Sequence, residues 1–218
     1  MPPASPHHSI MKYPIALSIA WLVLCGLPAH ADSTAQDGPS IDIGFTDSKM
    51  SLRLRLTPPA EDGWNGERNN LGATLTKKGK LPGENQQIEA YMMTLDAPSA
   101  SMSDYIDTIK ANIQEGYASN KKYRLVSSDV QADPKDTRCA KIHILLQDMQ
   151  PPPGSDGTDK KWSEQYTLSC GLTRVKRLGF EVRYYQRYFD PNKDERFAEK
   201  ADQLFRGVTI EEKTVDGQ

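Results

Sequence analysis

The sequence predicts an α+β fold in which helices flank an antiparallel β-sheet. Runs rich in β-branched and aromatic residues recur along the chain, and turn-forming segments separate most of them, which is typical of hairpin-connected strands. Two amphipathic helical segments bracket the later strands, and no internal repeat of useful length is visible. We therefore expect a single α+β domain over residues 47–212, with a polar lead-in at 32–46 and a polar tail at 213–218.

The N-terminal 31 residues have the three parts of a secretory signal peptide. Lys12 supplies the basic start, residues 15–27 form an uncharged, mostly apolar run, and an Ala-His-Ala cleavage site ends at Ala31. The apolar run is shorter than the roughly 20 residues that a membrane-spanning helix needs. We expect cleavage after Ala31 and a periplasmic protein without a stable membrane anchor, with Met11 as an alternative start of the chain.

Two alternatives for this leader stay open. Cys25 follows apolar residues, as in a lipoprotein signal, but the large Leu24 stands where such signals have a small residue. An uncleaved anchor is the second alternative, and the short apolar run disfavours it.

Charge narrows the class of partner. The chain carries 27 basic and 29 acidic side chains, and removal of residues 1–31 takes away one lysine and no acid. A nearly neutral mature chain without a block of like charge argues against a nucleic-acid partner.

The sequence predicts several strands besides the central hairpin. A first strand at Met50–Leu56 is ended by prolines, and a turn-rich segment with Trp64 follows it. Further strands are expected at Gln87–Leu95, at residues 123–131 and at Gly179–Phe189, because these runs are rich in β-branched and aromatic residues.

Two segments have the start and stop signals of amphipathic helices. The first should begin after Ser101 or Ser103 and end at Gly116, which gives about three turns. The second should begin near Pro191 and end at Gly207. Its apolar face is formed by Phe197, Ala198, Ala201, Leu204 and Phe205.

Cys139 and Cys170 are the two cysteines that lie beyond the leader, and in an exported chain such a pair indicates a disulfide. The strand-like runs CAKIHILLQD and KWSEQYTLSC flank the Pro- and Gly-rich segment 150–161, so we expect a hairpin stapled at its base. Closing a loop of about 32 residues should stabilise the fold by roughly 3 to 4 kcal/mol. Two unpaired buried thiols are the alternative.

Pairing Cys139 with Cys170 fixes the register of this hairpin. It places Lys141, His143 and Leu145 opposite Leu168, Tyr166 and Glu164. That face is mixed in polarity, whereas Ala140, Ile142, Ile144 and Leu146 lie on the other face. Either a bulge shifts the register, or both faces of the sheet are partly covered.

The order of these elements resembles the PsbP-like fold. The segments that carry the resemblance are SLRLRLTPPAEDGW, SDYIDTIKANI and AEKADQLFRGVTI, and it covers about residues 49–211. In bacteria this fold occurs in small exported proteins such as the DcrB-like group and some immunity proteins of type VI secretion toxins. The resemblance implies an α/β/α sandwich. Members of the family mostly lack known enzymatic activity, and no functional residue can be carried over to this chain.

The chain offers no convincing catalytic or metal-binding pattern. Gly154 to Gly157 lacks the spacing of a nucleophile elbow, and any Ser-His-Asp triad would have to use His143, which lies mid-strand between isoleucines. Zinc would lack ligands because the two cysteines are better used in a disulfide. We expect no catalytic residue, no metal and no cofactor.

A calcium ion near Asp190 stays open. Asp190, Asn192 and Asp194 have the spacing that begins a calcium loop, but Glu195 and Ala201 stand where such a loop has glycine and glutamate. A polar turn with helix-capping acids is the favoured interpretation.

Tyr185, Arg187 and Tyr188 are the best recognition signal, because tyrosine and arginine are enriched where partners make energetic contacts. The alternative is that a sheet covered on both sides simply buries them. The loop of the hairpin is a second candidate contact, at Pro152, Asp156 and Asp159.

These observations favour a non-enzymatic periplasmic binding protein, most specifically an immunity-type inhibitor of a toxin that type VI secretion delivers to the periplasm. An envelope maintenance or accessory protein without a toxin partner is the alternative. A hydrolase with an unrecognised site is a remote third hypothesis.

Overall fold

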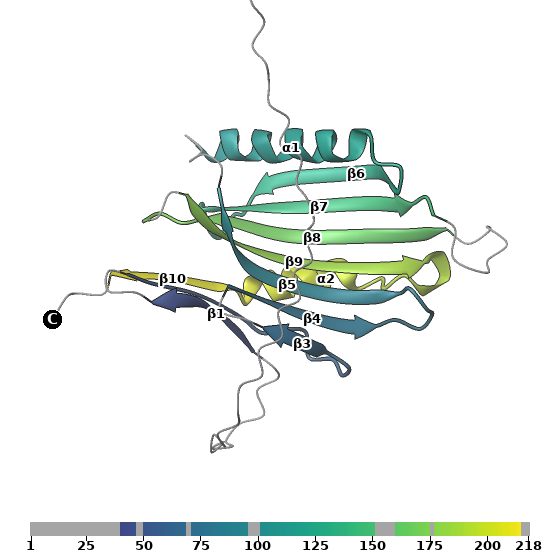
Figure 1. Ribbon diagram of the computed structural model, residues 1–218, viewed down its shortest axis with the longest axis horizontal. Coiled ribbons are helices and arrows are strands. Elements are labelled where there is room, and N and C mark those ends of the chain that lie inside the picture. The colour runs from purple at the N-terminus through teal and green to yellow at the C-terminus, as the bar shows by residue number, and fades with distance from the viewer. Residues whose placement is uncertain are drawn as a thin grey trace, which may run out of the picture. The chain divides into compact units, whose positions relative to one another are not determined.

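The computed structural model describes residues 40–46, 50–68, 71–95, 101–150, 160–174 and 177–214. Within these ranges the fold is α+β, with ten strands, two α-helices and one short 3-10 helix (Figure 1). The predicted signal peptide lies outside the described residues. So do the predicted loop contacts, Pro152, Asp156 and Asp159.

Seven strands form one antiparallel sheet in the order β3–β4–β5–β9–β8–β7–β6. They are β3 (Asn65–Arg68), β4 (Gly72–Lys78), β5 (Asn85–Thr94), β6 (Tyr123–Ala132), β7 (Cys139–Asp148), β8 (Lys161–Gly171) and β9 (Leu178–Phe189). β5 and β9 are neighbours although helix α1 (Met102–Ala118) and three strands separate them in sequence. Consecutive hairpins therefore build the half of the sheet that runs from β6 to β9.

A smaller antiparallel sheet has the order β1–β2–β10, with β1 at Ile41–Thr46, β2 at Met50–Leu56 and β10 at Thr209–Thr214. The chain reaches β10 through the 3-10 helix η1 (Asp190–Asn192) and helix α2 (Phe197–Arg206). Both chain ends of the described domain therefore meet in this sheet.

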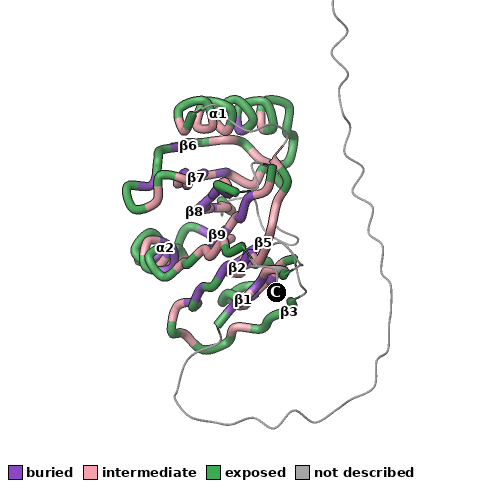
Figure 2. The backbone as a smooth tube through the Cα atoms, turned by 90° about the vertical axis from the view of Figure 1, so that its left-hand side faces the viewer, coloured by how far each residue is buried: buried purple, intermediate pink, exposed green. Residues whose placement is uncertain are grey.

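The two helices pack on opposite sides of the seven-stranded sheet (Figure 2). On what we call the α2 side, α2 and the small sheet bury alternate residues of β4, β5, β8 and β9, such as Ile88 and Val182. On the α1 side, α1 covers the alternate residues of β6 and β7, such as Val130 and Ile142. The larger core thus lies on the α2 side.

The predicted disulfide and hairpin register are confirmed. Cys139 and Cys170 are bonded and each is only 1% exposed. Lys141, His143 and Leu145 face Leu168, Tyr166 and Glu164, as expected, and the β7–β8 register is continuous. Of the two alternatives for the mixed face, the structure therefore has partial cover on both sides, and the bulge lies instead in β6 between Leu125 and Ser127.

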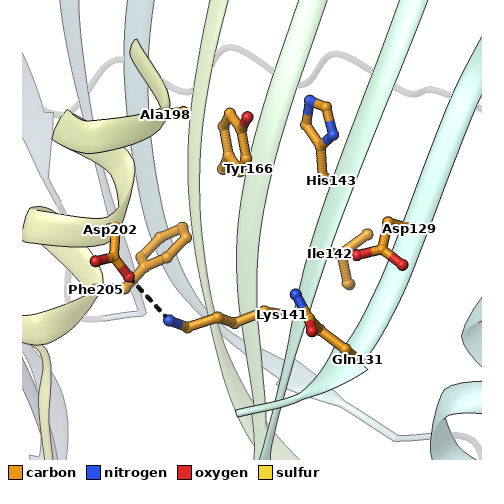
Figure 3. A pocket seen from close by; sticks show the side chains of 9 residues that line it. All are labelled: Asp129, Gln131, Lys141, Ile142, His143, Tyr166, Ala198, Asp202 and Phe205. Carbon is orange, nitrogen blue, oxygen red and sulfur yellow. Dashed lines mark hydrogen bonds and ion pairs between the residues drawn. The ribbon is translucent and has the colours of Figure 1, made fainter. Parts of the chain in front are cut away.

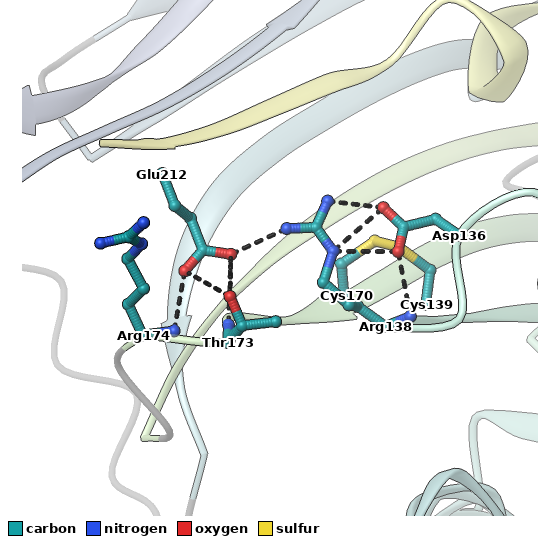
Figure 4. A network of polar contacts seen from close by, with 7 residues as sticks. All are labelled: Asp136, Arg138, Cys139, Cys170, Thr173, Arg174 and Glu212. Atoms are coloured by element: carbon teal, nitrogen blue, oxygen red, sulfur yellow. Dashed lines mark hydrogen bonds and ion pairs between the residues drawn. A yellow bond between two sulfur atoms is a disulfide. The ribbon is translucent and has the colours of Figure 1, made fainter. Parts of the chain in front are cut away.

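A polar network ties the small sheet to the base of this hairpin (Figure 4). Arg138 donates to Asp136 (2.6 Å) and to Glu212 of β10 (2.7 Å). Glu212 also accepts from the backbone N–H groups of Thr173 (3.2 Å) and Arg174 (2.9 Å). The Glu212 side chain is only 5% exposed. This buried carboxylate joins β10 to the segment before β7 and to the segment after β8.

Helix α1 begins as expected but is longer than predicted. The Ser101 hydroxyl accepts a hydrogen bond from the Asp104 N–H (3.1 Å), which confirms Ser101 as the N-cap. The helix continues through Gly116 to Ala118 and has 17 residues, so the expected end at Gly116 is wrong. Tyr117 packs against the core under α1, and this burial offsets the roughly 1 kcal/mol that glycine costs inside a helix.

The strand at Met50–Leu56 has the expected bounds, but other strands were missed. The end of the expected polar lead-in forms β1, in which Ile41 and Ile43 are buried, and the expected tail contributes the end of β10. The turn-rich segment after Trp64 contains β3 and β4, which form a hairpin. The domain therefore begins before residue 47.

Candidate functional site

Each side of the seven-stranded sheet is only half covered. A helix or the small sheet packs over one half, and the other half has no such cover. α1 packs mainly over β6 and β7, which leaves the α1 side of β9, β5 and β4 without a helix over it. On the α2 side the order is reversed, because α2 packs over β8 and β9 and leaves β6 and most of β7 uncovered. These two areas are the candidate sites that the fold creates.

A groove of 760 Å³ runs between α1 and the uncovered part of the α1 side. Its apolar wall includes Ile109 and Ile113 of α1, and its polar wall includes Glu181 and Arg183 of β9. The hydroxyl groups of Tyr105 and Ser169 are 2.7 Å apart and join the helix to the floor of the groove. The groove can therefore hold an amphipathic ligand, with apolar contacts along the helix and polar contacts along the strand.

Two tyrosine–arginine stacks continue this groove across β9 and β5. The Arg183 guanidinium lies 5.1 Å from the ring centre of Tyr91, and that of Arg187 lies 5.9 Å from the ring of Tyr185. We call these four residues the Tyr–Arg row. The strand register explains it, because Tyr185 and its odd-numbered neighbours in β9 share the α1 side with the odd-numbered residues of β5.

Carboxylates balance the charge of Arg183. Arg183 forms ion pairs with Glu181 and, at 3.8 Å, with Glu89. Burial, followed by the charge of Glu181, raises the pKa of Tyr91, so this phenol stays neutral. The row therefore offers flat aromatic faces and hydrogen-bond donors, which are suited to recognition.

The three recognition residues expected in β9 divide between the two sides of the sheet. Tyr185 and Arg187 are half-buried and belong to the Tyr–Arg row. Tyr188 points to the α2 side and is only 6% exposed, so it is not part of the Tyr–Arg row. Sequence reasoning missed Tyr91 and Arg183, because the pairing of β5 with β9 is needed to bring these two residues together.

A smaller pocket of 280 Å³ occupies the uncovered part of the α2 side (Figure 3). His143 stacks on Tyr166 with ring centres 4.3 Å apart, and its Nε2 lies 3.0 Å from Glu164 Oε1. Lys141 forms an ion pair with Asp202 of α2 at 3.1 Å. Glu164 also accepts a hydrogen bond from Gln186. His143 is therefore part of a packed polar cluster.

The acids after β9 make internal contacts. Asp190 accepts from the indole of Trp162, and Asp194 accepts from the Arg196 N–H (3.0 Å) and from Lys200 (2.6 Å). Asn192 donates to Glu84 at 2.9 Å. These bonds form the polar turn that precedes α2, and the part of the chain described by the structure has no cluster of three or more potential metal ligands.

Acid should weaken the fold through carboxylates that are hydrogen-bonded in the native state. Burial opposes the charge of Glu84, Glu164 and Glu212, but hydrogen bonds from neighbouring donors outweigh it and hold each pKa below the usual value of 4.5. A depressed native pKa contributes stability that is present above about pH 4.5 and is lost as the pH falls through the native pKa. We expect the urea midpoint to fall steeply below that pH.

The variant Glu164→Gln tests one contribution to this acid sensitivity. It should be less stable than the wild type at neutral pH, and the difference between their urea midpoints should shrink as the pH falls through the depressed native pKa of Glu164, because the protonated carboxyl is then uncharged like the amide. A difference that does not change with pH would contradict this assignment.

No family model and no curated protein matches the chain. Among solved structures it is similar to the Ran-binding protein Mog1p of Saccharomyces cerevisiae, at 11% identity and a TM-score of 0.40, over 72% of this chain and 89% of that one. It is also similar to a point mutant of the protein Mog1, at 12% identity and a TM-score of 0.38, over 78% of this chain and 95% of that one. Similarity at this level assigns neither function nor partner. None of the helices in the described ranges is long and apolar enough to cross a membrane.

Proposed function

We propose that this chain is a non-enzymatic, exported protein-binding protein that receives its partner on the uncovered half of the α1 side. The observation that carries the proposal is the Tyr–Arg row beside the 760 Å³ groove. Tyrosine and arginine supply much of the energy at protein interfaces, because they combine a large contact area with directional hydrogen bonds.

The specific form of this function is that of an immunity protein, which blocks a toxin delivered to the periplasm by type VI secretion. The leader and the disulfide support an oxidising compartment outside the cytoplasm. The resemblance of the element order to PsbP-like proteins, with their α/β/α sandwich, supports a binding role. An inhibitor also needs a stable surface more than a reactive group, and the Tyr–Arg row lies on two central strands of a seven-stranded sheet.

The test is inhibition of a purified toxin encoded beside this chain by residues 32–218 produced in an oxidising compartment. The wild type should inhibit it, and Tyr91→Ala/Tyr185→Ala should raise the dissociation constant at least about thirtyfold, because truncating even one central interface tyrosine costs about 2 kcal/mol. The dissociation constant is measured by calorimetry, and the circular dichroism spectrum checks that the variant is folded.

His143→Ala is the matched control, because it removes an aromatic side chain from the α2 side without touching the row. It should bind the toxin as the wild type does. If the toxin binds neither form and stays active, the immunity proposal fails and the envelope accessory function takes its place. If His143→Ala loses binding and the tyrosine variant does not, the proposed face is wrong.

A further inference from the structure

A basic pocket of 430 Å³ lies where β4 and β9 end and β5 begins. Lysines from the end of β4 and from the turn after it line one wall, and residues that follow β9 line the other. Its basic residues are Lys77, Lys78, Lys80, Arg187, Lys193 and Lys200, and its acidic residues are Glu61, Glu84 and Asp194. The pocket therefore carries an excess of positive charge in a chain whose net charge is −2.

The three carboxylates of the pocket are engaged in internal bonds. Glu61 pairs with Lys77 (2.5 Å) and with Lys200, and Asp194 pairs with the same Lys200 (2.6 Å). Glu84 accepts from the backbone N–H groups of Leu81 (2.9 Å) and Phe189 (3.0 Å) and from Asn192. These acids hold the turns of the pocket in place and neutralise only two of its lysines.

Four cations of the pocket are not neutralised by an ion pair with a described carboxylate. Lys78, Lys80 and Lys193 are exposed, and together with Arg187 they form no ion pair within 4 Å with a carboxylate of the described residues. Lys193 interacts with the buried Glu164 only at longer range. Burial raises the pKa of that carboxyl, and the charge of Lys193 is the smallest of several influences that lower it. Four like charges around one pocket repel one another, so an anion placed among them is favoured.

Arg187 adds an independent sign that a ligand belongs here. Its Nε is buried and has no hydrogen-bond partner among the described residues, and neither has Oδ1 of Asn85, the residue directly opposite in β5. An unpaired buried donor of this kind is costly and rare in native proteins. A carboxylate that draws the guanidinium toward the opening of the pocket would satisfy this donor, because Arg binds carboxylates through two parallel N–H groups.

We propose that this pocket binds glutamate or aspartate side chains from an acidic segment of the protein partner. The inference rests on the proposed function and names the chemistry of the partner. Arg187 belongs both to the pocket and to the Tyr–Arg row, so the acidic segment lies at the end of the same binding surface. Charge steering by Lys78, Lys80 and Lys193 should also make association faster at low ionic strength.

The test uses acetylated hexaglutamate as the probe and residues 32–218 with the disulfide intact. Binding is followed by amide chemical shifts in NMR spectra at low salt. We expect shifts at Asn85 and Arg187, a binding constant that falls as salt is added, and about tenfold weaker binding by Lys78→Glu/Lys193→Glu. The matched control is Lys110→Glu, which reverses an exposed charge on α1 away from the pocket and should bind within twofold of the wild type.

Three outcomes would overturn the proposed acidic-segment site. The first is no chemical shift change with hexaglutamate, and the second is that the Lys110→Glu control weakens hexaglutamate binding as much as Lys78→Glu/Lys193→Glu does. The third is a hexaphosphate probe that binds as tightly as hexaglutamate, since that would assign a phosphate ligand. The probe needs no partner, so its result is separate from that of the toxin assay. Hexaglutamate binding without toxin inhibition would remove the proposed function alone. Toxin inhibition that Lys78→Glu/Lys193→Glu leaves intact would remove the acidic segment alone.

Discussion

Replacing both cysteines, as Cys139→Ala/Cys170→Ala, should lower the free energy of unfolding by about 3 to 4 kcal/mol. The bond joins residues that are 31 apart in sequence, so its loss releases a long loop in the unfolded chain. The effect should be measured by urea unfolding under oxidising conditions, with the slope of the transition recorded because the unfolded state becomes less compact.

Thiol reductant provides the control for this prediction. Reduction should bring the wild type close to the double variant, while the variant itself should not respond, since no disulfide remains among its described residues. Both cysteine side chains are buried, so part of the stability lost in the double variant comes from lost packing. The reduced wild type keeps this packing and should therefore stay slightly more stable than the double variant. A double variant as stable as the oxidised wild type would show that the hairpin does not depend on the staple.

Glu212→Ala should destabilise the fold by about 2 to 3 kcal/mol. The change leaves Arg138 with one carboxylate instead of two and takes the acceptor from the N–H groups of Thr173 and Arg174 (Figure 4). Because these segments join β10 to the base of the hairpin, the small sheet should loosen first. Urea unfolding gives the size of the loss, and hydrogen exchange of the β10 amides gives its place.

Glu211→Ala is the matched control, because Glu211 is the neighbouring residue of β10 and forms only exposed ion pairs, with Arg55 and Lys213. It should leave the urea midpoint nearly unchanged. If Glu211→Ala and Glu212→Ala destabilise the protein equally, the effect belongs to strand propensity and the network does not stabilise the fold.

Local patterns predicted the parts of the fold that depend on neighbours in sequence. Alternation and the cysteine pair gave the β7–β8 hairpin its register, and Ser101 gave the start of α1. The apolar face of α2 was also readable, with Phe197, Ala201, Leu204 and Phe205 buried, although Ala198 is exposed. Each of these features is determined within about 30 residues.

Features that depend on distant pairing could not be read in this way. β1 has few residues, and its Ile41 and Ile43 become core only because β1 pairs with β2 in the small sheet, which packs against the seven-stranded sheet. The four-residue β3 has only exposed side chains and so lacks an alternating pattern. The Tyr–Arg row likewise needs β5 beside β9, and the role of Glu212 needs a contact with Arg138, 74 residues earlier.

The most direct test of the proposed binding face is hydroxyl-radical footprinting of a complex with the proposed toxin partner, which reports the solvent access of individual side chains. We predict that Tyr91 and Tyr185 are oxidised more slowly in the complex, while His143 on the α2 side is oxidised at its free rate. Protection of His143 with unchanged oxidation of Tyr91 and Tyr185 would place the partner on the other side of the sheet and contradict the account.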